Sequence, residues 1–404
     1  MAKKLYIGKN GFSDIKKLVC HIREKNRVIK AAPAKTVSGV FKINENAKRL
    51  HPDYQKMTIE EVIDHAGAEA KTFILSAGTA AYFRAGQYLS VSLNIGESVL
   101  TRPYSISSAP SFSKAGKYAI TVRRTTGGFA SDYILDNWKV GDAVTVSEPL
   151  GNFYYEDLRD EADVIALAGG SGITPFLSMA HAIADGTEDF NLTILFGSRT
   201  KDSILFKKEL DAIAKECSKV KVIYVLSDEK KRGYENGFIN AGLISKYAPK
   251  DKAYSVFMCG PEAMYRFAEK ELEKLGLDRK HIRRELLGVT KKVWENADYP
   301  ANLKGKTFSA VIRQGSQEST IAVSADETVL AAIERAGIAA PSRCRSGECG
   351  WCRSKLISGD VYIPAENDED RRASDKASGY IHPCSAFALS DLVIEVPATY
   401  VNKI

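Results

Sequence analysis

The sequence lacks the features that would place it in or across a membrane. No run of about 18 apolar residues occurs among its 404 positions, which argues against a membrane-spanning helix. The amino terminus has no apolar segment of the kind that secretory signals carry. Cysteine is also scarce, and three of the seven, Cys20, Cys217 and Cys259, fall in no cysteine-spacing pattern. Scattered cysteines suit a reducing compartment better than a disulfide framework, so we expect a cytoplasmic protein.

The length and the charge indicate a chain of several parts. A chain of 404 residues is too long for one ordinary core, so about two to four domains are expected. Residues 1–60 hold 14 Lys and Arg against 5 Asp and Glu, a net charge of +9, whereas residues 304–404 hold 12 against 13. The basic segment is either an ordinary solvated face or a docking surface for an acidic protein or an anionic membrane. No nucleic-acid-binding motif accompanies the charge.

Three cysteines near the carboxyl end follow the spacing C-x4-C-x2-C. They are Cys344, Cys349 and Cys352, and Cys384 follows later in the segment H-P-C-S. A zinc site would need two close pairs or a mixture of Cys and His, and only one close pair exists here. The observed spacing is typical of plant-type [2Fe–2S] proteins. We therefore expect these four cysteines to bind a [2Fe–2S] cluster.

Residues 58–156 contain short β-branched runs separated by turns. The runs lie at 59–64, 72–75, 88–93, 118–123 and 143–146. Their spacing predicts an antiparallel barrel. Two short motifs lie within it, Arg102-Pro-Tyr104-Ser105 and the later glycine pair Gly127-Gly128.

From about residue 163 continuous apolar strands alternate with helical stretches. The strands are predicted at 164–168, 193–196, 222–226 and 255–259. This repetition predicts a doubly wound parallel sheet, whose ligand binds at the carboxyl ends of the strands. A glycine-rich turn, Gly169 to Pro175, follows the first of these strands, and Cys259-Gly260-Pro261 follows the last. Residues 304–404 then read as the strands, helix and cysteine loop of a β-grasp ferredoxin.

These motifs and their order resemble the ferredoxin–NADP reductase superfamily, in the form that carries a C-terminal plant-type [2Fe–2S] ferredoxin domain. Reductase components of bacterial oxygenase, demethylase and hybrid-cluster-protein systems have this form. The resemblance implies a multidomain chain with an antiparallel flavin barrel, a doubly wound α/β nucleotide domain and a β-grasp domain. The expected parts are a basic N-terminal extension (1–57), a flavin-binding barrel (58–156), an NAD(P)H-binding domain with linker (157–303) and a ferredoxin domain (304–404).

The resemblance also implies roles for individual residues. Arg102 would bind a flavin phosphate, Tyr104 would stack on the flavin ring, and Ser105 would reach flavin N5. Gly127, Gly128 and Ser131 would hold a second phosphate, which FAD has and FMN lacks, so FAD is favoured. NAD(P)H would lie on the glycine turn with its nicotinamide beside Cys259. Glu285 corresponds to an acidic residue near the flavin, so Ser105, Cys259 and Glu285 are the expected catalytic residues. The other expected cofactor-binding residues are Gly127, Gly128, Ser131, Gly169, Gly170, Gly172, Thr174, Pro175, Gly260 and Pro261.

Two opposing signals concern the choice between NADH and NADPH. Ser198 and Arg199 follow a strand end and could bind a 2′-phosphate, which favours NADPH. Asp228 and Glu229 follow the next strand, where carboxylates would repel that phosphate. On balance NADH is favoured.

The number of electrons orders the cofactors. NAD(P)H gives up two electrons as a hydride and a [2Fe–2S] cluster takes one, so a flavin must lie between them. We therefore expect an electron-transfer reductase that passes electrons from NAD(P)H through FAD to the cluster and on to a partner protein. Transfer from a reduced ferredoxin to NAD(P)+ and redox sensing are the alternatives. The N-terminal extension matches no motif; a helix is predicted over 14–24 and a short strand over 36–43.

Overall fold

The computed structural model describes residues 11–32, 41–125, 127–285, 287–288, 292–369 and 371–398. The chain divides into two units, Met1–Arg49 and Leu50–Ile404. Among the described residues, none of the helices combines the length and the hydrophobicity that a membrane crossing requires.

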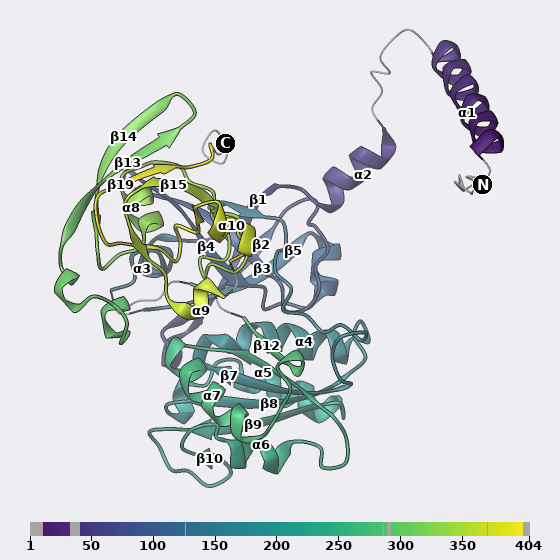
Figure 1. The fold of residues 1–404 in the computed structure, drawn as a ribbon. Helices are drawn as coiled ribbons and strands as arrows, with labels where there is room; N and C mark the ends of the chain where they lie inside the picture. The colour runs from purple at the N-terminus through teal and green to yellow at the C-terminus, as the bar shows by residue number, and fades with distance from the viewer. Residues whose placement is uncertain are drawn as a thin grey trace. The chain divides into compact units, whose positions relative to one another are not determined.

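The N-terminal unit contains two helices, α1 (Gly11–Ala31) and α2 (Lys42–Leu50) (Figure 1). α1 confirms the helix predicted over 14–24. The strand predicted over 36–43 lies mostly outside the described residues, and it is wrong for Lys42 and Ile43, which form the first turn of α2. Residues 42–50 carry good helix formers and neither glycine nor proline, so the local sequence favours a helix there.

The first domain of the second unit is built on an antiparallel sheet of six strands, in the order β4-β3-β6-β1-β2-β5. An isolated bridge between Ile106, just after β4, and Ile120 in β5 joins the two ends of this order. Alternate inward side chains such as Phe73, Leu89 and Ile120 fill the interior. The elements are β1 (Tyr54–His65), β2 (Ala70–Ser76), β3 (Tyr88–Ile95), β4 (Ser98–Ser105), β5 (Lys117–Arg123), α3 (Phe129–Asn137) and β6 (Ala143–Ser147).

All five strands predicted for the barrel are present, and one strand was missed. β4 carries the Arg102-Pro-Tyr104-Ser105 motif, and the proline in it weakens the sequence signal for a strand. β1 begins at Tyr54, four residues before the predicted start of the barrel, because Tyr54 pairs with Ser147 of β6. Gln55 is already buried there, with its amide nitrogen 2.9 Å from the carbonyl of Ser147.

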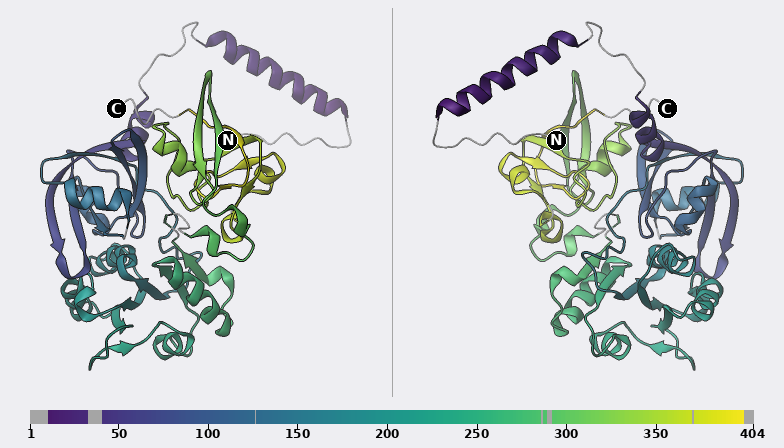
Figure 2. Two further views of the ribbon diagram at one scale, coloured as in Figure 1. Left: turned by 90° about the vertical axis from the view of Figure 1, so that its left-hand side faces the viewer. Right: turned by 90° about the vertical axis from the view of Figure 1, so that its right-hand side faces the viewer.

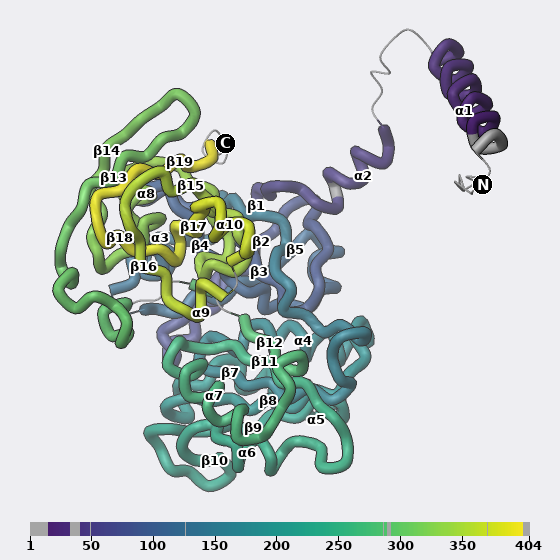
Figure 3. Tube along the Cα trace, in the orientation of Figure 1, coloured from purple at the N-terminus to yellow at the C-terminus, as the bar shows by residue number. Residues whose placement is uncertain are grey.

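The second domain has a parallel sheet with the strand order β10-β9-β8-β7-β11-β12. Successive residues of β7 point to opposite faces: Ala166 packs against one apolar cluster with α4 and α5, and Leu167 packs against another with α6 and α7. Figure 3 shows β7 and β8 in the middle of this domain, with β11 between β7 and the edge strand β12. The elements are β7 (Asp163–Gly169), α4 (Thr174–Ala184), β8 (Asn191–Ser198), α5 (Lys207–Glu216), β9 (Val220–Leu226), β10 (Glu235–Asn236), α6 (Ala241–Tyr247), β11 (Ser255–Cys259), α7 (Glu262–Lys274) and β12 (Ile282–Arg284).

The strand order reverses between β7 and β11. From β7 the chain moves outward through β8 and β9, and it then returns to place β11 on the other side of β7. In open parallel sheets the ligand crevice lies at such a reversal, outside the carboxyl ends of the strands. Gly169 and Cys259 end these two strands, since Cys259 pairs with Ala168.

The third domain is a five-stranded sheet in the order β14-β13-β19-β15-β17, with a small β16-β18 pair. β13 and β19 are parallel and the other neighbours are antiparallel, which is the β-grasp arrangement expected. The β13–β14 hairpin projects beyond the rest of this domain (Figure 2). The elements are β13 (Thr307–Gln314), β14 (Gln317–Ser324), α8 (Val329–Arg335), β15 (Ser354–Ser358), β16 (Val361–Tyr362), α9 (Ala365–Asp368), α10 (Ala373–Ala377), β17 (Tyr380–Ile381), β18 (Phe387–Ala388) and β19 (Leu392–Glu395).

Candidate functional site

The four predicted cluster cysteines lie together as two pairs. The sulfur atoms of Cys352 and Cys384 are 3.3 Å apart, and the amide nitrogen of Cys349 lies 3.4 Å from the sulfur of Cys344. Cys344, Cys352 and Cys384 are buried, and Cys349 is exposed. Two pairs fit a two-iron cluster, because each iron is then bound by two cysteines and by the bridging sulfides.

Backbone amides of the loop approach the sulfur atoms of Cys344 and Cys349, and the hydrogen bond between these two thiols lowers the pKa of Cys344 and raises that of Cys349. The amide of Trp351 lies 3.5 Å from the sulfur of Cys349. Hydrogen bonds from the Cys349 thiol, and then from the hydroxyl and amide of Ser346, lower the pKa of Cys344. Thiolates are the form that binds iron. Among the described residues, no three His, Cys, Asp or Glu side chains gather around one point as a single metal ion requires.

A second group of predicted residues meets where the barrel faces the nucleotide domain. Ser105 ends β4, Cys259 ends β11, and Glu285 follows β12. The hydroxyl of Ser105 donates to Oε2 of Glu285 at 2.8 Å, and the thiol of Cys259 lies 3.9 Å from the same oxygen. The structure therefore brings together all three residues expected to be catalytic.

Glu285 is buried at this corner, and its backbone is fixed on both sides. Its amide donates to the carbonyl of Met258 at 3.0 Å, and its carbonyl accepts from the hydroxyl of Tyr265. Burial raises the pKa of Glu285 to about 8, while the hydrogen bond from Ser105 opposes that rise. Burial also raises the pKa of Cys259. Burial therefore favours the protonated, uncharged forms of both groups.

The glycine turn packs against the end of β11 so closely that side chains are excluded. A Cβ atom at Gly172 would lie 2.1 Å from the carbonyl oxygen of Cys259. Gly170 has φ of +56°, and a Cβ there would lie 2.5 Å from Nη1 of Arg123. Thr174 begins α4, and its hydroxyl donates to the carbonyl of Ser171 at 2.9 Å. Pro175 follows it as a buried residue of the first turn, so the backbone of the turn is presented beside Gly260 and Pro261 at the switch point.

The other predicted phosphate-binding residues lie at the start of α3 and on β4. Gly128 is the N-cap of α3, and a Cβ on it would lie 2.2 Å from the hydroxyl of Ser131. Gly127 has φ of +69°, a conformation that favours glycine. A helix start with exposed amides favours an anion. On β4, the Arg102 guanidinium donates to the carbonyl of Thr101 at 2.7 Å, and Tyr104 packs against the barrel core.

The residues expected to choose between NADH and NADPH lie on adjacent strands. The amide of Ser227 donates to the carbonyl of Ser198, and the amide of Asp228 donates to the carbonyl of Arg199, both at 3.0 Å. Asp228 and Arg199 are exposed there, while Glu229 accepts from the amide of Lys201. Arg199 and the two carboxylates, Asp228 and Glu229, therefore lie together at the carboxyl ends of β8 and β9.

Three known sequence families match consecutive parts of the chain. Residues 61–155 match an oxidoreductase FAD-binding domain, residues 166–270 an oxidoreductase NAD-binding domain, and residues 312–389 a 2Fe-2S iron-sulfur cluster binding domain. The ferredoxin reductase component of the 3-ketosteroid-9-alpha-monooxygenase of Mycobacterium tuberculosis is 30% identical over 304 residues. This alignment covers 73% of the present chain and 79% of the relative. The chain belongs to this family of iron–sulfur flavin reductases.

Two further comparisons agree with membership of the ferredoxin–NADP reductase superfamily. The glycine betaine monooxygenase reductase subunit of Chromohalobacter salexigens is 27% identical over 327 residues, covering 78% of this chain and 87% of the relative. The structure of phthalate dioxygenase reductase superposes with a TM-score of 0.60 and 26% identity, covering 85% of this chain and 98% of that one. The predicted family and fold class are thereby confirmed.

The family assigns the cofactors and the overall reaction. This reductase is an NAD(P)H-dependent flavin and iron–sulfur oxidoreductase that uses FAD and a [2Fe–2S] cluster. It passes electrons from NAD(P)H through FAD to the cluster and on to a partner protein. The paired cysteines fit the cluster, and the glycine-lined turns fit two dinucleotides.

Sequence reasoning missed the residues that join the reductase's barrel to its cluster loop. Tyr88 of β3 pairs with Ser105 of β4, and it packs in one apolar cluster with Leu150 and the predicted cluster ligand Cys344. Glu334 and Arg345 form a buried ion pair beside the same loop. Arg345 stands next to a ligand in the sequence, but nothing there shows which residue it meets, because Glu334 comes from a separate helix.

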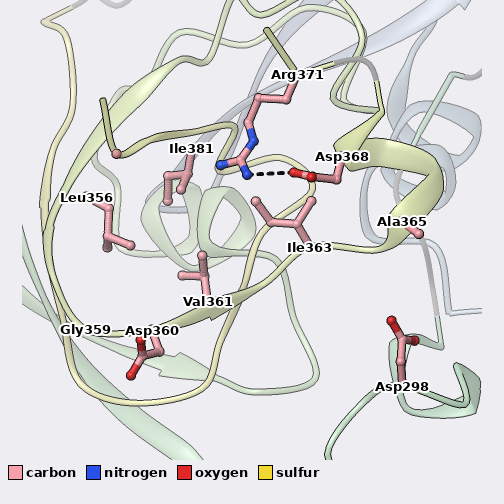
Figure 4. A pocket seen from close by; sticks show the side chains of 11 residues that line it. Asp298, Leu356, Gly359, Asp360, Val361, Ile363, Ala365, Asp368, Arg371 and Ile381 are labelled. Carbon is pink, nitrogen blue, oxygen red and sulfur yellow. Dashed lines mark ion pairs between the residues drawn. The ribbon is translucent and has the colours of Figure 1, made fainter. Parts of the chain in front are cut away.

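A pocket of the reductase lies away from these residues. It has a volume of about 550 Å³ and is formed by the ferredoxin domain with Asp298 of the preceding segment. Figure 4 shows the ion pair of Asp368 and Arg371 at its wall. None of the predicted site residues lines it.

Proposed function

We propose that this chain is the reductase component of an oxygenase system, which takes a hydride from NADH and delivers electrons singly through its cluster to an oxygenase. The relatives named above are reductases of oxygenases, and one observation supports the internal path of the electrons. We call the group of Ser105, Cys259 and Glu285 the hydride corner. The cluster ligand Cys344 packs against Tyr88, and Tyr88 is the strand partner of Ser105 in that group. Tyr88 therefore adjoins both the hydride corner and the cluster loop, which favours internal transfer over two independent activities.

Each group of residues has its own role in this proposal. The glycine turn from Gly169 to Gly172 would hold the pyrophosphate of NADH, and Cys259 would lie beside its nicotinamide. Ser105 and Glu285 would face the flavin ring, which takes up the hydride and releases the two electrons one at a time. Arg102 and the start of α3 would bind the two phosphates of FAD. Cys344, Cys349, Cys352 and Cys384 would hold the cluster.

We further propose that the acceptor docks on the basic N-terminal unit. The described part of α1 exposes a stripe of aliphatic side chains, with basic residues flanking it. Apolar residues at this helical spacing, flanked by cations, suit an amphipathic anchor on an acidic partner. The stripe consists of Ile15, Leu18, Val19, Ile22 and Ile29.

Removal of residues 1–49 tests this docking. The cut precedes β1, so Gln55 keeps its bonds to the barrel. Ferricyanide reduction should be unchanged, because a small acceptor needs no docking surface. Turnover with the oxygenase should fall and lose most of its salt dependence, since charges more than about 8–10 Å apart are screened at physiological ionic strength.

A matched variant separates charge from the apolar stripe. Replacing Lys16, Arg23 and Lys30 by Gln keeps the helix and its stripe but removes three cations. As in the truncated protein, turnover with the oxygenase should lose most of its salt dependence. If the truncated protein serves its oxygenase equally well at low salt, the docking proposal fails and the segment is only a solvated extension.

The preference for NADH gives a second test. Asp228 lies beside Arg199 at the edge where a 2′-phosphate would be bound, and its carboxylate would repel that phosphate. Asp228→Ser should raise kcat/KM for NADPH about tenfold, a change of about 1.4 kcal/mol, with little effect on NADH. Asp251→Ser, which removes an exposed carboxylate just before β11 at the opposite sheet edge, is the control. An unaltered ratio of NADH to NADPH activity would remove Asp228 from the coenzyme site.

We also propose a cytoplasmic location. None of the seven cysteines, all of which the structure describes, forms a disulfide, and Cys20 and Cys217 stand outside both the cluster and the hydride corner. Free thiols of this kind suit a reducing compartment.

A further inference from the structure

A buried carboxylate of the ferredoxin domain contacts two arginines of different function. Glu334, in α8, is 3% exposed. It accepts two hydrogen bonds from Arg345, at 2.5 and 2.9 Å, and Nη1 of Arg102 lies 3.5 Å from its Oε2. Arg345 adjoins the cluster ligand Cys344, whereas Arg102 belongs to the flavin-binding strand β4. One side chain therefore links the cluster loop to the flavin-binding strand.

Arg345 needs this partner for two reasons. Its side chain is among the largest that are fully buried, and an unpaired buried charge is costly. Its backbone has φ of +63°, which is strained for a residue other than glycine and persists only where the surroundings fix it. The two hydrogen bonds to Glu334 hold the side chain of Arg345 in place and so help to maintain this backbone conformation. A shift of Arg345 would move Cys344, its immediate neighbour, relative to Tyr88.

The same network extends across the domain boundary. The carbonyl of Thr101 accepts from Arg102 at 2.7 Å and from Arg345 at 3.3 Å. The hydroxyls of Thr101 and Ser342 are 2.6 Å apart. These bonds join β4 to the segment that leads into the cluster loop, so the position of the cluster loop depends on the strand that presents Ser105.

The charges of the network are unequal. Two guanidinium groups share one carboxylate, which leaves an excess of one positive charge in a largely buried place. Burial, and then the charge of Arg345, lower the pKa of Arg102 to about 10. An anion bound at Arg102 would balance this charge, and a flavin phosphate is the anion that the proposed function supplies.

We propose that Glu334 is a positioning residue for electron transfer between the flavin and the cluster, acting through Arg102 and Arg345 to seat the cluster loop against β4. It touches neither the hydride corner nor the cluster sulfurs in the contacts described above. Its effect is on the relative placement of Cys344 and Tyr88. Because the rate of electron transfer falls exponentially with the separation of donor and acceptor, a displaced cluster loop should be visible as slower reduction of the cluster.

The test compares two Glu334 variants with a matched control in full-length protein loaded with FAD and iron. Glu334→Gln removes the charge, and Glu334→Asp keeps it but shortens the reach so that one carboxylate no longer serves both arginines. Glu327→Gln removes an ion pair with Arg335 that lies wholly inside the ferredoxin domain. Stopped-flow mixing with NADH separates flavin bleaching from reduction of the cluster, and electron paramagnetic resonance of the dithionite-reduced protein verifies that the cluster is intact.

The proposal rests on the proposed function, and the two phases distinguish their failures. Both Glu334 variants should bleach flavin at the wild-type rate but reduce the cluster at least tenfold more slowly, with an unaltered resonance signal. Glu327→Gln should match the wild type in both phases. A Glu334→Asp protein that reduces its cluster at the wild-type rate overturns the role of Glu334, and this variant serves alone if Glu334→Gln does not fold. A wild-type protein whose flavin bleaches without later cluster reduction overturns the proposed function instead.

Discussion

Cys349→Ser will stop electron delivery to protein acceptors while leaving the reduction of flavin by NADH intact. The wild type should contain about two iron atoms per chain, and the variant should contain almost none. Turnover with a protein acceptor should fall at least about a hundredfold, since even loss of a residue that supports a metal ligand costs ten- to a hundredfold. Flavin bleaching should persist because Ser105, Cys259 and Glu285 lie on the barrel and the nucleotide domain.

Cys349 suits this experiment because it is the one exposed residue of the four predicted cluster ligands, so serine in its place creates no buried cavity. Cys217→Ser is the control, because Cys217 is a half-buried thiol next to α5 with no role in the cluster. Its iron content and acceptor turnover should equal those of the wild type. Zinc in place of iron in anaerobically prepared wild-type protein would contradict the cluster assignment. Loss of flavin bleaching in Cys349→Ser would contradict the separation of the two sites.

The sequence predicted the site residues best where the chemistry demands a fixed local spacing. The loop from Cys344 to Cys352 must surround one cluster, so its cysteines are recognisable without any knowledge of the fold. The spacing of these cysteines acts within a few residues, and a sequence displays it directly. The glycine turn was recognisable as a motif, but the reason for Gly172 lies in a distant segment, because a side chain there would collide with the carbonyl of Cys259.

Contacts between distant segments could not be predicted in this way. Ser105 and Glu285 are 180 positions apart, and their hydrogen bond follows only from the register of β4 and the placement of β12 beside β11. The resemblance to the reductase superfamily pointed to each of the two residues, but it did not predict the hydrogen bond between them. Tyr88 carried no signal at all, because an aromatic residue in a strand is usually a core residue. Its contact with Cys344 depends on how two domains pack.

The N-terminal unit illustrates a different limit. The spacing of Ile15, Leu18, Val19 and Ile22 predicted one helix face, and α1 has that face. The pattern could not show whether the face is covered, since periodicity reports amphipathicity and not the partner. The ion pair of Glu334 and Arg345 could not be predicted either, because the sequence does not show which residue is the partner. A glutamate near the end of a helix is ordinarily solvent-exposed, and only the fold shows that this one is buried.

Enlarging the side chains of the hydride corner should slow flavin reduction by well over tenfold, which corresponds to at least about 1.4 kcal/mol in activation free energy. Cys259→Leu and Ser105→Val each add bulk beside Oε2 of Glu285, where hydride donor and acceptor must approach closely. Stopped-flow bleaching of the flavin by NADH measures the effect, with Cys217→Leu as a control for a bulkier side chain elsewhere in the nucleotide domain.

Added bulk at a buried position also costs stability, about 1–3 kcal/mol, so thermal unfolding must accompany the kinetics. Ser105→Ala provides a variant without that cost, because it removes only the hydroxyl that donates to Glu285. That hydrogen bond holds the pKa of Glu285 down against burial, so its loss should raise the pKa further above 8. Any inflection that Glu285 contributes to the pH profile of flavin bleaching should therefore move to higher pH in Ser105→Ala. Bleaching rates that stay at the wild-type value in Cys259→Leu and Ser105→Val, with both proteins folded, would remove these residues from the path of the hydride.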